Sequence, residues 1–182
     1  MWTLIFIVLL SFGWESAELQ TWAKTQPNPD PVPELANGYT FTGAFFSKLA
    51  TAASDKPGVV TVEVIGTSVK ERPILAFHIT DPVTPVERKV LVFAGIHALE
   101  WISTEVALRF LDEVIETPPK GTMVTVIPLL NPDGRARVER DLLERANRYR
   151  RGNEKNVDLN RSATARFCEN GPKSAFNRKL RL

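Results

Sequence analysis

One apolar segment constrains the fold of this chain more than any other feature. Residues 89–95 read Lys-Val-Leu-Val-Phe-Ala-Gly, a nearly continuous apolar run that is typical of a central strand covered on both faces. Apolar residues then recur at every fourth position from Ile102 to Val114, which predicts a helix with one apolar stripe that stops at Pro118. Residues 123–130 form a further apolar strand, which the turn sequence Asn131-Pro-Asp-Gly134 ends.

The residues before this unit predict a helix and a hairpin. Residues 41–53 have the spacing of an amphipathic helix, and residues 60–64 alternate between valine and polar residues, as in a half-buried strand. Turn-forming residues 66–73 lead into a second strand over residues 74–80, so that the two strands form a hairpin. From this order of elements we expect an α/β fold, an α/β/α sandwich around a mixed β-sheet, beginning near Tyr39.

Two segments at the start of the chain are expected to lie outside this globular region. Residues 1–10 are almost entirely apolar, and a run of that length is too short to span a bilayer. We therefore expect residues 1–17 to be a cleaved signal peptide of a secreted protein; a buried N-terminal strand is the alternative. Four prolines between Gln26 and Pro33 predict an extended Pro-rich linker over residues 18–38.

Charge is distributed unevenly along the chain. The formal net charge of +2 is no sign of a nucleic-acid binder, but residues 131–182 carry 14 basic and 7 acidic side chains, against 9 and 14 in residues 1–130. The basic part indicates either polyanion binding or arginines gathered around an anionic substrate. Its last segment, residues 162–182, lacks a clear hydrophobic period and is expected to be a divergent basic tail. The single cysteine, Cys168, excludes an intrachain disulfide and a Cys-rich zinc finger.

Two potential metal ligands follow the first apolar strand directly. His97 and Glu100 lie three residues apart at the start of the predicted helix, so their side chains share one face and can converge on one ion. An imidazole and a carboxylate suit zinc, which needs one more protein ligand and a water to form a catalytic site. The alternative is a histidine hydrogen-bonded at a strand end and a glutamate that favours the helix N-terminus.

Further motifs follow in a fixed order and resemble those of one enzyme family. The stretches are Ile65-Gly66-x-Ser68-x-x-x-Arg72-Pro73-Ile74, Gly95-Ile96-His97-x-x-Glu100-Trp101-Ile102, Asn131-Pro132-Asp133-Gly134, Tyr149-Arg150-Arg151 and Asp158-Leu159-Asn160-Arg161. Together they resemble the zinc metallocarboxypeptidases of the carboxypeptidase A/B type, the funnelins. The resemblance covers residues 39–161, which would then be part of the catalytic domain. Any one motif is weak evidence, whereas the ordered set is specific.

The resemblance implies a role for five residues. His97 and Glu100 match the first two ligands of a site for one Zn²⁺ ion with two histidines and one glutamate, a ligand set known for carboxypeptidase A. Arg150 matches the arginine that polarises the scissile carbonyl and stabilises the oxyanion. Asn160 and Arg161 match the pair that binds the terminal carboxylate of the substrate. The resemblance therefore implies a monomeric, metal-dependent protease with no membrane span, whose substrates are peptides or proteins with a free C-terminal carboxylate.

The chain also departs from the family pattern. Leu99 stands where the best-known members have an arginine that assists substrate binding, and Ser162 follows Arg161 where another asparagine is usual. The family's third zinc ligand, a later histidine, and its general-base glutamate have no counterpart, since the two histidines of the chain are His78 and His97. His78 lies between apolar residues of a predicted strand, which favours a structural role. We therefore expect a truncated catalytic domain that is inactive as it stands.

Three alternatives to a carboxypeptidase remain at this point. The first is a non-catalytic pseudoenzyme that binds peptide C-termini or a protein partner. The second is an acyl-amino-acid deacylase with a related His-x-x-Glu site, which the Asn-Pro-Asp-Gly and Asp-Leu-Asn-Arg motifs disfavour. The third, nucleic-acid binding by the basic tail, is weaker again because no aromatic stacking pattern accompanies the charges.

Overall fold

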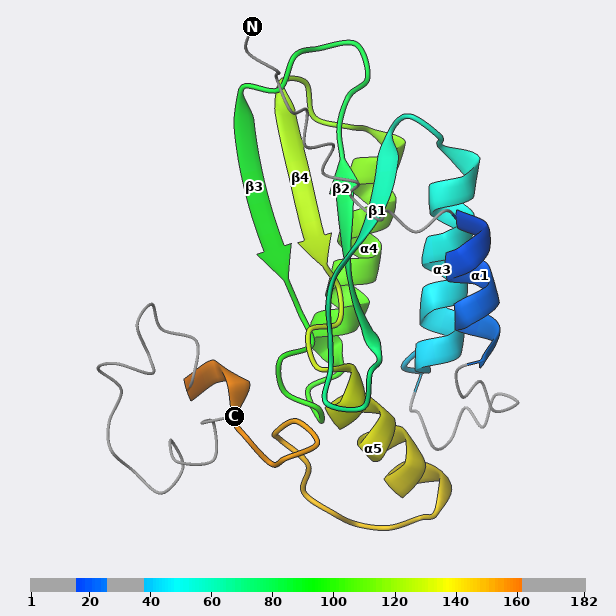
Figure 1. Cartoon of the computed structure of the whole chain (residues 1–182), viewed down its shortest axis with the longest axis vertical. Helices are drawn as coiled ribbons and strands as arrows, with labels where there is room; N and C mark the ends of the chain where they lie inside the picture. The colour runs from blue at the N-terminus through cyan, green and yellow to red at the C-terminus, as the bar shows by residue number, and fades with distance from the viewer. Residues whose placement is uncertain (1–15, 26–37, 162–182) are drawn as a thin grey trace, which may run out of the picture.

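The computed structural model describes residues 16–25 and 38–161. The expected signal peptide lies outside these residues except for its last two positions, and the expected basic tail lies wholly outside them, so both stay predictions. The elements in chain order are α1 (Ser16–Thr25), α3 (Thr42–Asp55), β1 (Val60–Thr67), β2 (Pro73–Ile79), β3 (Arg88–Phe93), α4 (Ile102–Glu116), β4 (Thr122–Ile127), α5 (Pro132–Leu143) and the short 3₁₀ helix η1 (Leu159–Arg161) (Figure 1).

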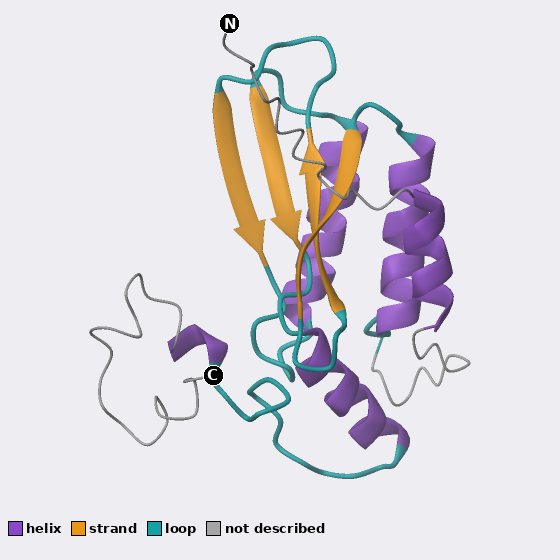
Figure 2. Cartoon of the chain, viewed as in Figure 1, coloured by secondary structure: helices purple, strands orange, loops and turns teal. Residues whose placement is uncertain are grey.

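Four strands form a mixed sheet in the order β1-β2-β4-β3 (Figure 2). β1 and β2 are the antiparallel hairpin predicted from sequence, and β2 also pairs antiparallel with β4. β3 and β4 pair in parallel from Arg88 opposite Thr122 to Phe93 opposite Ile127, with α4 as the crossover between them. The expected mixed sheet with helices is therefore confirmed.

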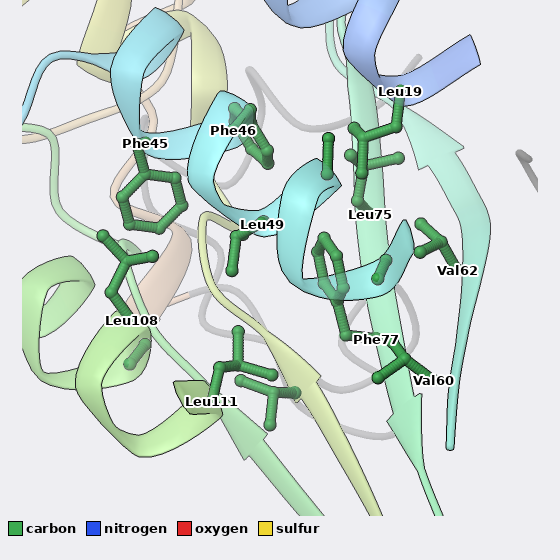
Figure 3. Close-up of a cluster of buried hydrophobic side chains, with 14 of the residues drawn as sticks. Leu19, Phe45, Phe46, Leu49, Val60, Val62, Leu75, Phe77, Leu108 and Leu111 are labelled. Atoms are coloured by element: carbon green, nitrogen blue, oxygen red, sulfur yellow. The ribbon is translucent and has the colours of Figure 1, made fainter. Parts of the chain in front are cut away.

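The core lies between one face of the sheet and the helices α1, α3 and α4. Figure 3 shows Phe45 of α3 beside Leu108 of α4, and Phe46, Leu111 and the strand residue Phe77 belong to the same cluster. Period-two alternation on the strands and the apolar stripes of the helices put these side chains on facing surfaces. Buried apolar surface of this kind is the main favourable contribution to folding.

The structure corrects the expectation for residues 89–95. They do not form a strand covered on both faces; within the described part of the chain β3 is an edge strand, and most of its residues are exposed. Leu91 and Phe93 are 60% and 53% exposed. An apolar run reports a preference for burial, but the position of a strand within the sheet depends on which other strands pair with it.

A second correction concerns the linker expected over residues 18–38. Residues 18–25 belong to α1, which packs against α3 with Leu19 and Ala23 fully or almost fully buried. The ring of Trp22 meets that of Phe46 edge-on, with 4.7 Å between the ring centroids. The packed region therefore begins well before Tyr39, while residues 26–37, which hold the four prolines, lie outside the described residues, so the linker stays a prediction there.

The third difference lies at Asn131-Pro-Asp-Gly134, which was expected to be a turn. These residues begin the helix α5: the side chain of Asn131 accepts a hydrogen bond from the N–H of Gly134, and Pro132 occupies the first turn. Asparagine at the N-cap and proline directly after it are favoured helix-start residues.

None of the helices within residues 16–25 and 38–161 is long and apolar enough to cross a membrane.

Candidate functional site

The parallel strands β3 and β4 bring two loops together at their carboxyl ends. Backbone hydrogen bonds continue past both strands, from Leu130 N–H to Ala94 O (2.9 Å) and from Asn131 N–H to Gly95 O (3.0 Å). Gly95 has φ of +65°, and a Cβ there would lie 2.8 Å from the side chain of Leu129. Only glycine fits this sharp turn without strain, and the turn delivers His97 to the strand end.

His97 and Glu100 converge as the sequence predicts. Nδ1 of His97 lies 3.0 Å from Oε2 of Glu100. The imidazole is 93% buried, whereas the Glu100 side chain is 47% exposed. Both residues lie in the segment between the end of β3 at Phe93 and the start of α4 at Ile102.

Asp158 completes the surroundings of the histidine. Its Oδ1 lies 3.1 Å from Nε2 of His97, so the two ring nitrogens face two different carboxylates. Burial opposes ionisation of Asp158, but hydrogen bonds from Arg151 and His97 outweigh that effect and lower the pKa of the carboxyl. The spacing of the Asp-Leu-Asn-Arg motif gave no sign of this contact, because Asp158 is 61 positions from His97 in the chain.

Arg151 joins the same cluster, and Arg150 does not. Nη1 of Arg151 donates to Oε1 of Glu100 (3.0 Å), and Nε donates to Oδ2 of Asp158 (2.9 Å). Nε of Arg150 instead donates to Oδ2 of Asp141 on α5, at 2.6 Å. Neighbouring side chains in a non-helical segment point in different directions, so the arginine that reaches the site is decided by the backbone path and not by the motif.

The remaining predicted residues, Asn160 and Arg161, lie in η1, directly after Asp158. Both are exposed, and their recorded hydrogen bonds are local: Asn160 N–H to Asp158 Oδ1 (3.0 Å) and Arg161 Nη1 to Asn160 O (3.1 Å). The structure thus places them next in the chain to the His97 cluster, and the backbone N–H groups of both donate to Asp158: Asn160 to its Oδ1, and Arg161 to its carbonyl (3.1 Å). His78 lies apart in β2, between Thr125 and Glu63, in keeping with a structural role.

Asn131 ties the loops of the site to α5. Its side-chain amide donates to the carbonyl of Ile96 (3.0 Å) and to that of Gly152 (3.2 Å), while its oxygen caps Gly134. At Gly134 an added Cβ would lie 2.7 Å from Gly152 O and 2.8 Å from the side chain of Ala98. The Asn-Pro-Asp-Gly motif therefore positions the site without belonging to it.

The donors present fit part of a zinc site. Zinc bonds to imidazole nitrogen and carboxylate oxygen are about 2.0–2.2 Å long, so two ligands 3.0 Å apart, as in His97 and Glu100, can contact one ion. The second nitrogen of a metal-bound histidine is usually held by a carboxylate, which is the position of Asp158. Among the residues that the structure describes, no group of three or more His, Cys, Asp or Glu side chains could hold a metal ion.

Comparisons with known proteins agree with this reading of the motifs. The family model for zinc carboxypeptidase matches residues 46–180. The chain is 26% identical to carboxypeptidase O of Bos taurus over 147 residues, which are 74% of this chain and 39% of that protein. It is 35% identical to the inactive metallocarboxypeptidase ECM14 of Saccharomyces cerevisiae over 107 residues, 52% of this chain and 25% of that protein.

A solved structure shares the fold. The chain matches bovine thrombin-activatable fibrinolysis inhibitor, solved in complex with tick carboxypeptidase inhibitor, with a TM-score of 0.55 and 23% identity. The match covers 63% of this chain and 37% of that one. The chain thus spans well under half the length of the relatives it matches. Because the family model covers most of its residues, the chain belongs to the zinc carboxypeptidase family.

Proposed function

We propose that this protein serves in the zinc-dependent removal of C-terminal residues from peptides or proteins, with His97 and Glu100 as two ligands of one zinc ion. The observation that supports this is the convergence of His97 Nδ1 and Glu100 Oε2 at 3.0 Å, with the other ring nitrogen held by Asp158. If these residues hold zinc, the ion would polarise a substrate carbonyl and lower the pKa of a bound water.

We assign the oxyanion-binding role to Arg151 in place of Arg150. The Arg151 guanidinium is fixed by Glu100 and Asp158, beside the proposed metal ligands. Its hydrogen bond to Asp158 raises its pKa, so it stays charged. A fixed positive charge at the point where negative charge develops stabilises the transition state without reorganisation. Arg150 is bound to Asp141 and would have to break that pair to reach the site.

Asn160 and Arg161 are proposed to bind the terminal carboxylate of the substrate. Their exposure leaves both side chains accessible to a ligand, and an arginine fork with an adjacent amide suits a carboxylate. The third zinc ligand and the general base would have to come from polypeptide other than the residues described, and secretion stays a prediction.

A second candidate function is binding of peptide C-termini without hydrolysis. The relative from Saccharomyces cerevisiae is named as inactive, and the described residues offer fewer than three ligands in one group. Such a protein would keep Arg151, Asn160 and Arg161 for recognition and would lack turnover.

An assay of the full 182-residue chain with a free-carboxylate peptide and its C-terminally amidated twin separates these functions. It also tests the expectation, drawn from the missing third histidine and general base, that the chain is inactive as it stands. Carboxypeptidase function predicts release of the last residue from the free-carboxylate peptide only, loss of that release with a chelator, and loss in Glu100→Gln. Glu113→Gln, on an exposed position of α4, is the matched control.

Binding of the free-carboxylate peptide without release would support the second candidate. The failure of both peptides to bind or react, with zinc present, would overturn both proposals for the chain. A zinc titration of the same chain, followed by competition with a chromophoric chelator, reports separately whether His97 and Glu100 hold the metal.

A further inference from the structure

A hollow of the surface lies between the β1–β2 hairpin and α5. It has a volume of about 410 Å³, which falls in the range of about 300–1,000 Å³ typical of ligand pockets. None of the residues of the proposed zinc site lines it. The lining residues are Lys70, Arg72, Asp133, Ala136, Arg137, Arg140, Leu143 and Glu154; we call this the α5 groove.

The α5 groove has an excess of positive charge. Four of its side chains are cationic and two are carboxylates. One carboxylate, Asp133, is buried and already saturated: it accepts hydrogen bonds from Ser68 Oγ (2.8 Å), Lys70 N–H (3.0 Å) and Arg72 Nη1 (2.7 Å). Asp133 therefore fixes the hairpin to α5 and leaves the groove positive.

The cations of the groove are only partly used within the protein. Glu154 stands 3.8 Å from Lys70 Nζ and 3.9 Å from Arg137 Nε, beyond hydrogen-bond length in both cases. Within the described residues, the Arg140 guanidinium has no hydrogen bond or ion pair, and Arg72 has no partner for its Nη2. Arg137 Nη1 already donates to the carbonyls of Asn153 (2.9 Å) and Glu154 (3.2 Å) and to Oδ1 of Asn156 (3.1 Å). The groups that can bind an incoming anion are therefore Lys70, Arg72 and Arg140, and the Glu154 carboxylate competes with that anion.

The groove also presents apolar surface. Ala136 and Leu143 line it from the same helix that supplies Arg137 and Arg140, and Leu143 is 42% exposed. These apolar side chains add no binding free energy for a small inorganic anion, which has no apolar surface to bury. Carboxylates that flank an apolar residue would use both features, because guanidinium groups bind carboxylates in paired hydrogen bonds and the apolar residue removes Leu143 from water.

We propose that the α5 groove binds acidic peptide segments in which carboxylate side chains flank an apolar one. This site is separate from the proposed zinc site and needs no free C-terminus.

The test is the affinity of the full 182-residue chain for the capped peptide acetyl-Asp-Glu-Leu-Asp-Glu-amide, followed by fluorescence anisotropy of a labelled copy. Its neutral twin, with Asn and Gln in place of the acids, is expected not to bind. Because the peptide is capped and nothing is hydrolysed, the result is independent of the proposed carboxypeptidase function. Affinity is expected to fall as ionic strength rises from about 0.01 M to about 0.15 M, since the screening length shortens from about 30 Å to about 8 Å.

Two substitutions are expected to act in opposite directions. Arg140→Gln removes a cation without an internal partner and should weaken binding about two- to fivefold, the scale of one exposed ion pair. Glu154→Gln removes the competing carboxylate and should strengthen binding by a similar factor. Arg109→Gln, at an exposed position of α4, should leave the affinity unchanged.

Three results would overturn the proposal. They are equal binding of the neutral twin, equal loss of affinity in Arg140→Gln and Arg109→Gln, and binding of inorganic phosphate as tight as that of the peptide. The last result would identify the α5 groove as a site for a phosphate group instead. Circular dichroism of each variant confirms that it is folded before binding is compared.

Discussion

Two clusters of arginine and carboxylate side chains in this protein differ in their access to water. In the first, Arg135 and Glu139 pair within α5 with side chains 3% and 1% exposed. In the second, Arg151 bridges Glu100 and Asp158. The side chain of Arg151 is 31% exposed, that of Glu100 47% and that of Asp158 18%. The residue types are the same, but only the second cluster can exchange an internal partner for a ligand.

The buried cluster joins three segments of the fold. Oε1 of Glu139 accepts from the N–H and the hydroxyl of Thr42 at the start of α3, both at 2.7 Å, and from Arg135 Nε at 3.1 Å. The Arg135 guanidinium also stacks on Trp101, 3.3 Å from the ring centroid. Burial raises the pKa of Glu139 and lowers the pKa of Arg135 to about 10. The comparison indicates that buried pairs hold the scaffold while half-exposed pairs are available for function.

The largest loss of stability is expected from a substitution in the buried cluster. Glu139→Gln leaves the Arg135 charge buried without a counter-charge, and we expect the free energy of unfolding to fall by about 3–5 kcal/mol. Urea denaturation at neutral pH measures this change. Glu113→Gln, at an exposed position of α4, is expected to change it by less than about 0.5 kcal/mol. A loss for Glu139→Gln no larger than that of the control would remove the distinction between the two clusters.

A substitution in the half-exposed cluster is expected to have an intermediate effect, and the quantity that it changes is the affinity for zinc, not the stability of the fold. Asp158→Asn replaces the carboxylate that faces His97 Nε2, and we expect zinc affinity to fall about 10–100-fold, as for other outer partners of metal-bound histidines. Asp112→Asn on α4 is the matched control. Unchanged zinc affinity in Asp158→Asn, in a chain that binds zinc, would show that the contact does not orient the ligand.

The smallest effect on stability is expected at Asp141, which lies on α5 two residues after Glu139. The hydrogen bond from Arg150 holds the pKa of Asp141 below its usual value. A carboxyl with a lowered folded-state pKa stabilises the fold above its unfolded pKa and loses that contribution as the pH falls. We expect Arg150→Gln to cost about 1 kcal/mol at pH 7 and to reduce the acid-induced loss of stability below about pH 4.

Thermal unfolding of the parent chain and of Arg150→Gln across the acid range measures this difference. The two curves should converge as the pH falls, because protonation of Asp141 removes the same interaction that the substitution removes. Curves that remain parallel would show that Arg150 does not act through the Asp141 carboxylate.

Much of the fold could be predicted from local sequence. The β1–β2 hairpin, the helices α3 and α4 and the strand β4 all lie close to their predicted ranges. β1 and the two helices have a clear period of two or of about 3.6 residues, whereas β2 and β4 were located by turn residues and an apolar run. The approach of His97 to Glu100 agrees with the prediction, but its reason differs: both residues lie in the turn before α4 and not on the helix from which the spacing argument was made. The ordered motifs were sufficient to indicate the family.

Other features depended on contacts between distant residues. Nothing in the apolar run of β3 distinguishes an edge strand from a central one, and nothing in Tyr149-Arg150-Arg151 shows which arginine meets Glu100. The partnership of Asp158 with His97 spans 61 positions.

The sequence by itself determined the β1–β2 hairpin, α3, α4, β4 and their order, and it singled out His97 and Glu100 as candidate ligands, because local periodicity and short spacing decide which side chains share a face. Only the tertiary structure decided which strand forms the edge and which arginine belongs to the site. Those choices depend on how the chain path brings separate segments together, and short-range patterns do not encode that path.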